Sequence, residues 1–184
     1  MSLTETPICN FDEKAKDFTL LSTDNKKISL KDIQGTNGTL VMFICNHCPY
    51  VKAVIKNIVD DAKYLEDFGI KSVAIMSNDV INYPEDSLEN MVSFSKLHKF
   101  SFPYLIDETQ EVAKEFGAVC TPDFFGYNKD LELQYRGRIR ELKNLKPIIN
   151  GDSELRIAMK QIAASKKGPK EQIPSMGCSI KWFK

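Results

Sequence analysis

The chain has 184 residues, a length that fits one globular domain with its own hydrophobic core. Its 25 basic residues balance its 25 acidic residues, so it lacks the net positive charge by which proteins bind nucleic acid or anionic membranes. No apolar run approaches the roughly 20 residues that cross a bilayer. We therefore expect a single domain over residues 1–184 that binds small molecules or other proteins.

The number of cysteines and the N-terminal residues indicate the cellular compartment of the protein. Five cysteines, at positions 9, 45, 48, 120 and 178, are too few for a scaffold of this length built on disulfides, and their number is odd. The N-terminus lacks the basic-then-apolar layout of a signal peptide. We therefore expect reactive or buried thiols in a cytoplasmic protein, unless a leader has been removed.

Patterns in the first half of the chain predict strands around one long helix. Two apolar–polar segments around an Asp–Asn turn predict a β-hairpin over residues 18–30, and the apolar run 39–44 is typical of a strand buried on both faces. Apolar residues recur at helical spacing from Tyr50 to Phe68, and Gly69 is placed to end that helix. A second buried-type strand over 70–76 completes a right-handed parallel crossover.

The second half continues the alternation of helices and strands. Residues 102–106 are expected to be extended, and residues 124–138 to form a hairpin. The spacing of apolar residues predicts three more helices, over 87–99, 107–116 and 153–164. The fold class is therefore α/β, with a core over about 15–165. The tail 166–184, rich in Lys, Gly and Pro at its start, is expected to be irregular.

The motif Cys45-Asn46-His47-Cys48-Pro49 lies between the buried strand and the long helix. A thiol at a helix N-terminus meets unsatisfied N–H groups and the positive end of the helix dipole, and both favour the thiolate. Such sites lower a cysteine pKa from about 8.5 to roughly 3.5–7.5. Pro49 suits the first helical turn because it has no N–H to leave unsatisfied. Cys48, at or next to the N-cap, is therefore the predicted nucleophile, and Cys45 is its natural resolving thiol.

Other interpretations of this motif remain open. His47 could add positive charge beside the thiolate or only shape the turn. Both cysteines could be buried and inert, or they could bind zinc together with His47 and another cysteine. The sequence has no second closely spaced ligand pair, so we expect neither a metal nor another cofactor. The position of the cysteine pair between strand and helix favours redox chemistry.

A second candidate segment, Val119-Cys120-Thr121-Pro122, comes just before the late hairpin. A proline that enters a strand needs a special geometry, and a cis Thr121–Pro122 bond is one such geometry.

Together these residues resemble the redoxins of the thioredoxin superfamily, in the branch related to alkyl hydroperoxide reductase and thiol-specific antioxidant proteins. The resemblance covers about residues 15–164 and implies a thioredoxin-like fold, with a central mixed sheet flanked by helices and an N-terminal hairpin. It also implies a cis Thr121–Pro122 bond beside Cys48, so that Thr121, Pro122 and Pro49 border the substrate groove. The motifs that carry it are Asp17-Phe18-Thr19-Leu20, the cysteine motif, Phe116-Gly117-Ala118-Val119, Thr121-Pro122 and Tyr135-Arg136-Gly137-Arg138.

The chain departs from the family pattern in informative ways. Val51 stands where thioredoxins have the resolving cysteine, and Cys45 stands where peroxiredoxins have a Thr or Ser that orients the peroxide. A peroxidase also needs an arginine near the thiolate, for which the candidates are Arg136, Arg138 and Arg140. Two further cysteines are possible accessories. Cys120 adjoins the site, whereas Cys178 either returns to it as a distant resolving thiol or is pinned to the body with Ile180 and Trp182.

Three functions follow from these patterns. In the leading hypothesis, Cys48 attacks a protein or small-molecule disulfide, Cys45 resolves the mixed disulfide, and a thiol reductant restores both. In a rival hypothesis, a peroxide oxidises Cys48 to a sulfenic acid that another cysteine captures. In a third, the domain is a noncatalytic module that holds an extended peptide at Thr121 and Pro122.

Overall fold

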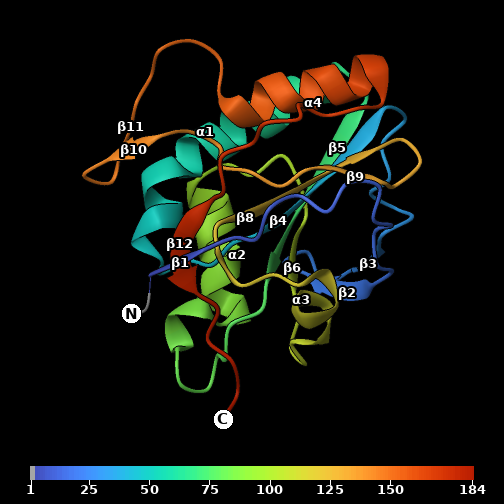
Figure 1. Ribbon diagram of the computed structural model, residues 1–184. Coiled ribbons are helices and arrows are strands. Elements are labelled where there is room, and N and C mark those ends of the chain that lie inside the picture. Colours follow the sequence, from blue (N-terminus) through green and yellow to red (C-terminus); the bar gives the residue numbers. More distant parts are fainter. Residues whose placement is uncertain (1–2) are drawn as a thin grey trace.

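A seven-stranded mixed sheet forms the centre of the computed structural model, which describes residues 3–184 (Figure 1). The strands lie in the order β3-β2-β6-β5-β4-β8-β9. Their bounds are Thr19–Ser22 for β2, Lys27–Ser29 for β3, Gly38–Phe43 for β4, Ile70–Met76 for β5, Tyr104–Ile106 for β6, Asp123–Asn128 for β8 and Leu133–Tyr135 for β9.

Helices cover both faces of this sheet. Buried residues of α1 (Pro49–Glu66), α2 (Leu88–Leu97) and α4 (Glu154–Ser165) share one apolar cluster with one face. Buried residues of α3 (Glu111–Phe116) pack on the opposite face. The result is the three-layered arrangement of an α/β protein, as the sequence predicts.

Strand β4 explains why the sheet is buried on both sides. Leu40 and Met42 point into the cluster with α1, whereas Val41 and Phe43 point into the cluster with α3. β4 pairs in parallel with β5 and antiparallel with β8, so the predicted crossover through α1 is confirmed. The carboxyl end of this central strand delivers the cysteine motif to the start of α1.

The predicted hairpins and helices are present, with shifted ends. β2 and β3 pair as the N-terminal hairpin, and β8 and β9 as the later one. The helix expected over 107–116 begins only at Glu111, because Gln110 has a left-handed backbone with φ of 63°. The side chain of Asp107 accepts a hydrogen bond from the Ala113 N–H at 2.9 Å, which satisfies one donor of the short helix. None of the helices within residues 3–184 is long and apolar enough to cross a membrane.

The expectation of an irregular C-terminal tail is wrong for four of its residues. Met176–Ser179 form β12, the middle strand of a second sheet with the order β1-β12-β7. In Figure 1, β12 lies beside β1 (Leu3–Glu5), although the two come from opposite ends of the chain. β7 (Cys120–Thr121) pairs with its other edge. β12 forms because its main chain pairs with β1 and β7, which are distant in the sequence. Local composition therefore does not predict it. A small hairpin, β10 (Leu142–Lys143) with β11 (Lys146–Pro147), was also not predicted.

Gly177 allows β12 to approach β7 closely. A Cβ atom built on Gly177 would lie 2.0 Å from the main-chain oxygen of Thr121, so a side chain would force the strands apart. We expect Gly177→Val to lower the free energy of unfolding by about 1–3 kcal/mol, the usual penalty for overpacking. Chemical denaturation measures this difference. The control is Met176→Val on the same strand, where the 40% exposed side chain should leave stability within about 0.5 kcal/mol. Equal stability of both variants would contradict the close packing.

Candidate active site

Cys48 is the N-cap residue of α1, and Pro49 occupies the first helical position. The backbone of Cys48 is extended, with φ of −65° and ψ of 122°, and therefore turns the chain from the loop after β4 into the helix. The Cys48 side chain is fully buried. This confirms the predicted position of the thiol, at the helix end whose dipole favours a negative charge.

Thr121 brings the two cysteines of the motif together. The Cys48 sulfur lies 3.2 Å from the main-chain oxygen of Thr121, to which its protonated form donates a hydrogen bond, and the Cys45 sulfur lies 3.4 Å from the Thr121 hydroxyl oxygen. The peptide bond between Thr121 and Pro122 is cis. The structure therefore joins the two segments that the sequence singled out.

The Cys48 sulfur lies among hydrogen-bond donors. A hydrogen bond from the Cys45 thiol is the largest influence on the pKa of Cys48, and it lowers that pKa. Burial acts in the opposite direction, but further hydrogen bonds from the Val51 N–H, the Thr121 hydroxyl and the Cys178 thiol outweigh it. The result is a pKa of about 5 for Cys48, so the thiolate is its dominant form at neutral pH.

The neighbouring thiols keep their protons. The hydrogen bond with Cys48, together with burial, raises the pKa of Cys45 well above its ordinary value. Burial first, and then the hydrogen bond and charge of Cys48, raises the pKa of Cys178 to about 12. The pKa of Cys48 is thus lowered, whereas the pKa values of its neighbours Cys45 and Cys178 are raised. Because Cys178 belongs to β12, the tail is held against the body and brings Cys178 to this site, whereas a resolving role for Cys178 stays a prediction.

The Cys120 side chain is oriented differently from those of Cys45, Cys48 and Cys178. It precedes Thr121 in β7, and alternation along a strand directs its side chain to the opposite face. Burial, with the nearby charge of Asp123, raises its pKa. Its sulfur lies 3.8 Å from the main-chain oxygen of Pro122. Cys120 is therefore a buried neighbour of the site, and it does not join the thiols around Cys48.

Asp86 organises the loop between the two cysteines, and sequence reasoning missed it. This buried carboxylate accepts hydrogen bonds from the Asn46 N–H at 2.8 Å, the Asn78 amide at 2.8 Å and His47 Nδ1 at 2.6 Å. Asn46 also accepts a hydrogen bond from the Tyr104 hydroxyl at 2.9 Å. Asp86 ends a short 3₁₀ turn, Pro84–Asp86, and no spacing pattern in the sequence links it to the motif.

The pair of His47 and Asp86 is ionic in character. The hydrogen bond to Asp86 raises the pKa of His47 and outweighs the lowering by burial. Burial alone would raise the pKa of Asp86, but the hydrogen bonds from His47 and Asn78 hold it below its usual value. His47 also stacks on Tyr83, with ring centroids 5.7 Å apart. His47 thus shapes the loop through Asp86, and its charge is largely balanced there.

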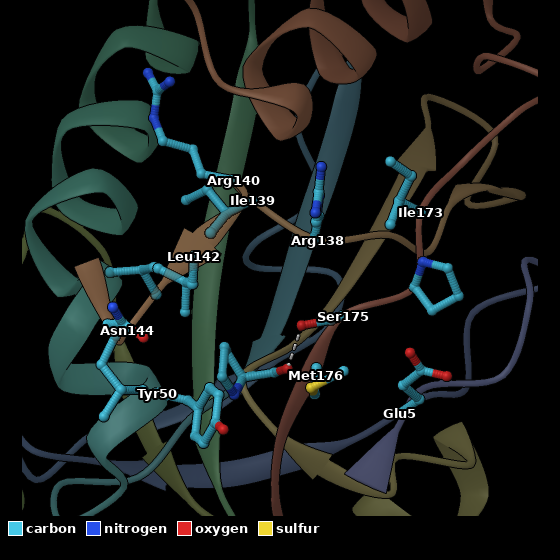
Figure 2. A pocket seen from close by; sticks show the side chains of 14 residues that line it. Glu5, Tyr50, Arg138, Ile139, Arg140, Leu142, Asn144, Ile173, Ser175 and Met176 are labelled. Atoms are coloured by element: carbon cyan, nitrogen blue, oxygen red, sulfur yellow. Dashed lines mark hydrogen bonds between the residues drawn. The ribbon is translucent and has the colours of Figure 1, made fainter. Parts of the chain in front are cut away.

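A pocket of about 430 Å³ opens beside the cis-proline loop (Figure 2). Pro122 and Tyr50, which follows Pro49 in α1, belong to its lining, and Figure 2 shows Leu142 and Ile173 on opposite sides of it. The Ser175 hydroxyl donates a hydrogen bond to the main-chain oxygen of Pro122 at 2.8 Å. Of the predicted groove residues Thr121, Pro122 and Pro49, only Pro122 is among the residues that line this pocket.

A model of the AhpC/TSA family matches residues 11–142. The chain belongs to the AhpC/TSA family. It is similar over its whole length to an uncharacterized conserved protein from Geobacillus kaustophilus, with 40% identity, 97% of that chain covered and a TM-score of 0.94. A hypothetical protein from Sinorhizobium meliloti is 34% identical, with 98% of each chain covered and a TM-score of 0.90. No curated protein matches the chain.

More distant structures share the fold alone. The peroxidoxin BcpB from Mycobacterium tuberculosis is 17% identical, with 69% of this chain and 83% of that chain covered and a TM-score of 0.57. The thioredoxin-like fold expected from the sequence is therefore confirmed, as is the redoxin family.

The arginines of this AhpC/TSA protein bind partners other than the Cys48 sulfur. Arg136 pairs with the buried Asp123 at 3.0 Å, and Arg138 donates to Glu154 at 2.8 Å. Arg140 donates to the main-chain oxygen of Gly151 at 2.7 Å. Figure 2 shows the Arg138 and Arg140 guanidinium groups at the end of the pocket away from Tyr50. The remaining arginine, Arg156, pairs with Asp61 at 2.7 Å.

One group of side chains could bind a cation. Ligand atoms of Cys45, His47 and Asp86 lie within 4.8 Å of one another, and sulfur, nitrogen and oxygen ligands of this kind suit zinc. Both Asp86 oxygens already accept hydrogen bonds from the loop and from Asn78. A cation would therefore have to displace the hydrogen bond between His47 and Asp86.

The low pKa of Cys48 can be measured directly. In the reduced protein, we expect the ultraviolet absorbance of one thiolate to rise as the pH increases through about 5. Cys45→Ala removes the donor with the largest effect, so the midpoint should move upward, towards the ordinary cysteine value. Cys120→Ser, which alters a buried thiol on the other face, should leave the midpoint in place. A midpoint unchanged by Cys45→Ala would contradict the proposed source of the shift.

The His47–Asp86 pair gives a second titration. Asp86→Asn removes the carboxylate that raises the pKa of His47, so this pKa should fall and His47 should lose its proton at a lower pH. Ring resonances in nuclear magnetic resonance spectra measure this change. The other histidine of the chain, His98, has a pKa lowered by burial and serves as the internal control. An equal shift of both histidines would point to a general loss of structure.

Proposed function

We propose that this protein is a thiol–disulfide oxidoreductase in which Cys48 is the attacking nucleophile. The observation that carries this proposal is the position of the Cys48 thiol at the N-cap of α1, with Cys45 brought to the same site by Thr121. The pKa of Cys48 is lowered there to about 5, whereas that of Cys45 is raised. Disulfide exchange needs one thiolate to attack and a second thiol to resolve. The membership of this chain in the redoxin family supports the same class of chemistry.

The reaction takes two steps. The Cys48 thiolate attacks one sulfur of a substrate disulfide, R–S–S–R′, and R′–S⁻ leaves with the electron pair of the broken bond. Cys45 then loses its proton to the departing thiolate, attacks the Cys48 sulfur and releases the second half of the substrate. The protein is left with a Cys45–Cys48 disulfide, and its two thiols have supplied two electrons. A thiol reductant returns it to the starting state.

The raised pKa of Cys45 suits this order of events. The Cys48 charge helps to keep the Cys45 proton in place before the reaction. Once the Cys48 sulfur is part of a mixed disulfide, that charge is gone, and deprotonation of Cys45 becomes easier. The second thiol is therefore released for attack only after the first has reacted.

Peroxide reduction is the second candidate, and the match to the AhpC/TSA family model favours it. The site lacks two features that such chemistry uses. A thiol, Cys45, occupies the place of the hydroxyl that orients the peroxide, and the guanidinium groups of Arg136, Arg138 and Arg140 contact other partners. A noncatalytic peptide-binding module is disfavoured, because β12 already pairs with the main chain of Cys120 and Thr121.

Two assays on one variant series separate these functions. We expect the reduced protein to be oxidised rapidly by oxidised glutathione, and Cys48→Ser to lose this reaction down to the uncatalysed background, because it has no nucleophile. Cys120→Ser, as a matched buried substitution, should retain wild-type rates. Disulfide formation and thiol loss are followed by mass spectrometry.

The same proteins are then exposed to hydrogen peroxide. Rapid sulfenic acid formation on Cys48, with slow reaction towards oxidised glutathione, would instead establish the peroxidase. Inertness of Cys48 in both assays would exclude both enzymes.

A further inference from the structure

Three side chains with metal-binding atoms meet at the cysteine loop. Cys45 and His47 belong to the loop, whereas Asp86 lies 39 positions after His47, at the end of the 3₁₀ turn. One sulfur, one ring nitrogen and one carboxylate oxygen from these residues lie within 4.8 Å of one another. The zinc interpretation of the motif lacked a further ligand close in the sequence, and the fold supplies Asp86 in that place.

Further hydrogen bonds hold Cys45 and Asp86 in position. The Cys45 sulfur lies 3.4 Å from the Thr121 hydroxyl oxygen, so Thr121 fixes its direction. One Asp86 oxygen accepts a hydrogen bond from the Asn46 N–H and the other from the Asn78 amide, each at 2.8 Å. Metal ligands in proteins are commonly oriented by outer contacts of this kind. Both groups therefore have the support that a metal site needs before the ion arrives.

His47 is the most accessible of the three ligands. Its side chain is 14% exposed, whereas that of Asp86 is fully buried. The ring stacks on Tyr83, which limits its rotation, and its Nδ1 lies 2.6 Å from an Asp86 oxygen. Ligand atoms with bonds of about 2.0–2.3 Å to one zinc ion lie roughly 3.3–3.7 Å apart in a tetrahedron. The contact between His47 and Asp86 must therefore widen by about 1 Å, with the ion in place of the shared proton.

The mixture of ligand atoms favours zinc over other common cations. Calcium and magnesium are bound through oxygen atoms, whereas zinc takes sulfur, nitrogen and oxygen together. Among the described residues, Cys45, His47 and Asp86 are the group that offers this combination. Three protein ligands also leave the fourth position of a tetrahedral zinc ion for water.

We propose that the reduced protein binds one zinc ion through Cys45, His47 and Asp86, and that the bound ion withholds Cys45 from disulfide exchange. The second half of this inference rests on the proposed function. Binding displaces the proton of the Cys45 thiol and the proton between His47 and Asp86, and both protons pass to the solvent without any transfer of electrons. While its sulfur is bonded to zinc, Cys45 does not resolve a mixed disulfide on Cys48.

A titration with zinc sulfate tests the ligands. The reduced protein competes with a chromophoric chelator, which gives the stoichiometry and the dissociation constant. We expect one zinc ion per chain, and Asp86→Asn and His47→Ala should each weaken binding at least about tenfold, because each removes a ligand. Cys120→Ser and His98→Ala are the matched controls and should bind zinc as the wild type does, because neither residue belongs to the group.

A measurement on the wild-type protein guards against misfolded variants. The chain has two histidines, and only His47 belongs to the metal-binding group. In nuclear magnetic resonance spectra of the reduced protein, added zinc should move the ring resonances of His47 and leave those of His98 in place. Zinc binding that leaves His47 unmoved, or no zinc binding by the reduced wild type, would overturn the site. Full affinity in both Asp86→Asn and His47→Ala would also overturn it, in favour of binding by cysteines alone.

The effect on exchange is measured separately. Zinc-loaded and metal-free protein are mixed with oxidised glutathione, quenched in acid and mapped by mass spectrometry. We expect the glutathione adduct on Cys48 to persist at least about tenfold longer in the zinc-loaded protein, and a chelator to restore its rapid resolution. Equal lifetimes would overturn the withholding of Cys45. Failure of the metal-free protein to react would instead overturn the proposed function, whereas the titration and the histidine resonances test the metal site independently of it.

Discussion

A negative charge on a fully buried sulfur is the constraint on which the rest of this site depends. Burial penalises a thiolate, so the Cys48 charge needs hydrogen-bond donors that replace water. The Val51 N–H comes from the helix that Cys48 itself begins, whereas Thr121, Cys45 and Cys178 come from three other segments. The site therefore exists only when the sheet, the cis-proline loop and the C-terminal strand are assembled.

Two of the segments that carry these donors are in turn held by further groups. Asp86 holds the loop that separates Cys45 from Cys48, and its own charge is balanced by His47. β1 holds the far edge of β12, which sets the place of Cys178. Asp86 is buried and these supporting groups are all hydrogen-bonded, so the position of the Cys48 sulfur is determined by a connected network and not by one contact.

Among family members, the choice of reaction depends on what surrounds a similarly placed cysteine. A hydroxyl and a guanidinium would stabilise the two oxygens of a peroxide. Here Cys45 supplies a thiol in place of the hydroxyl, and Arg136 is neutralised by Asp123 in a buried ion pair. Under the proposed function, the Cys45 thiol beside Cys48 instead takes up the two-electron oxidation as a disulfide. In that case, the same fold carries different redox chemistry through a few substitutions beside one sulfur.

The sequence by itself determined the α/β order of elements and the position of Cys48 at a helix start, because apolar periodicity and a strand–cysteine–proline–helix junction are local patterns. It also indicated Thr121 and Pro122 through family resemblance. Only the tertiary structure decided that Asp86 organises the cysteine loop, that Arg136, Arg138 and Arg140 are engaged elsewhere and that the tail forms β12. These contacts join residues between 11 and 175 positions apart, as Arg140–Gly151 and Leu3–Cys178 illustrate, and no local pattern encodes such pairings.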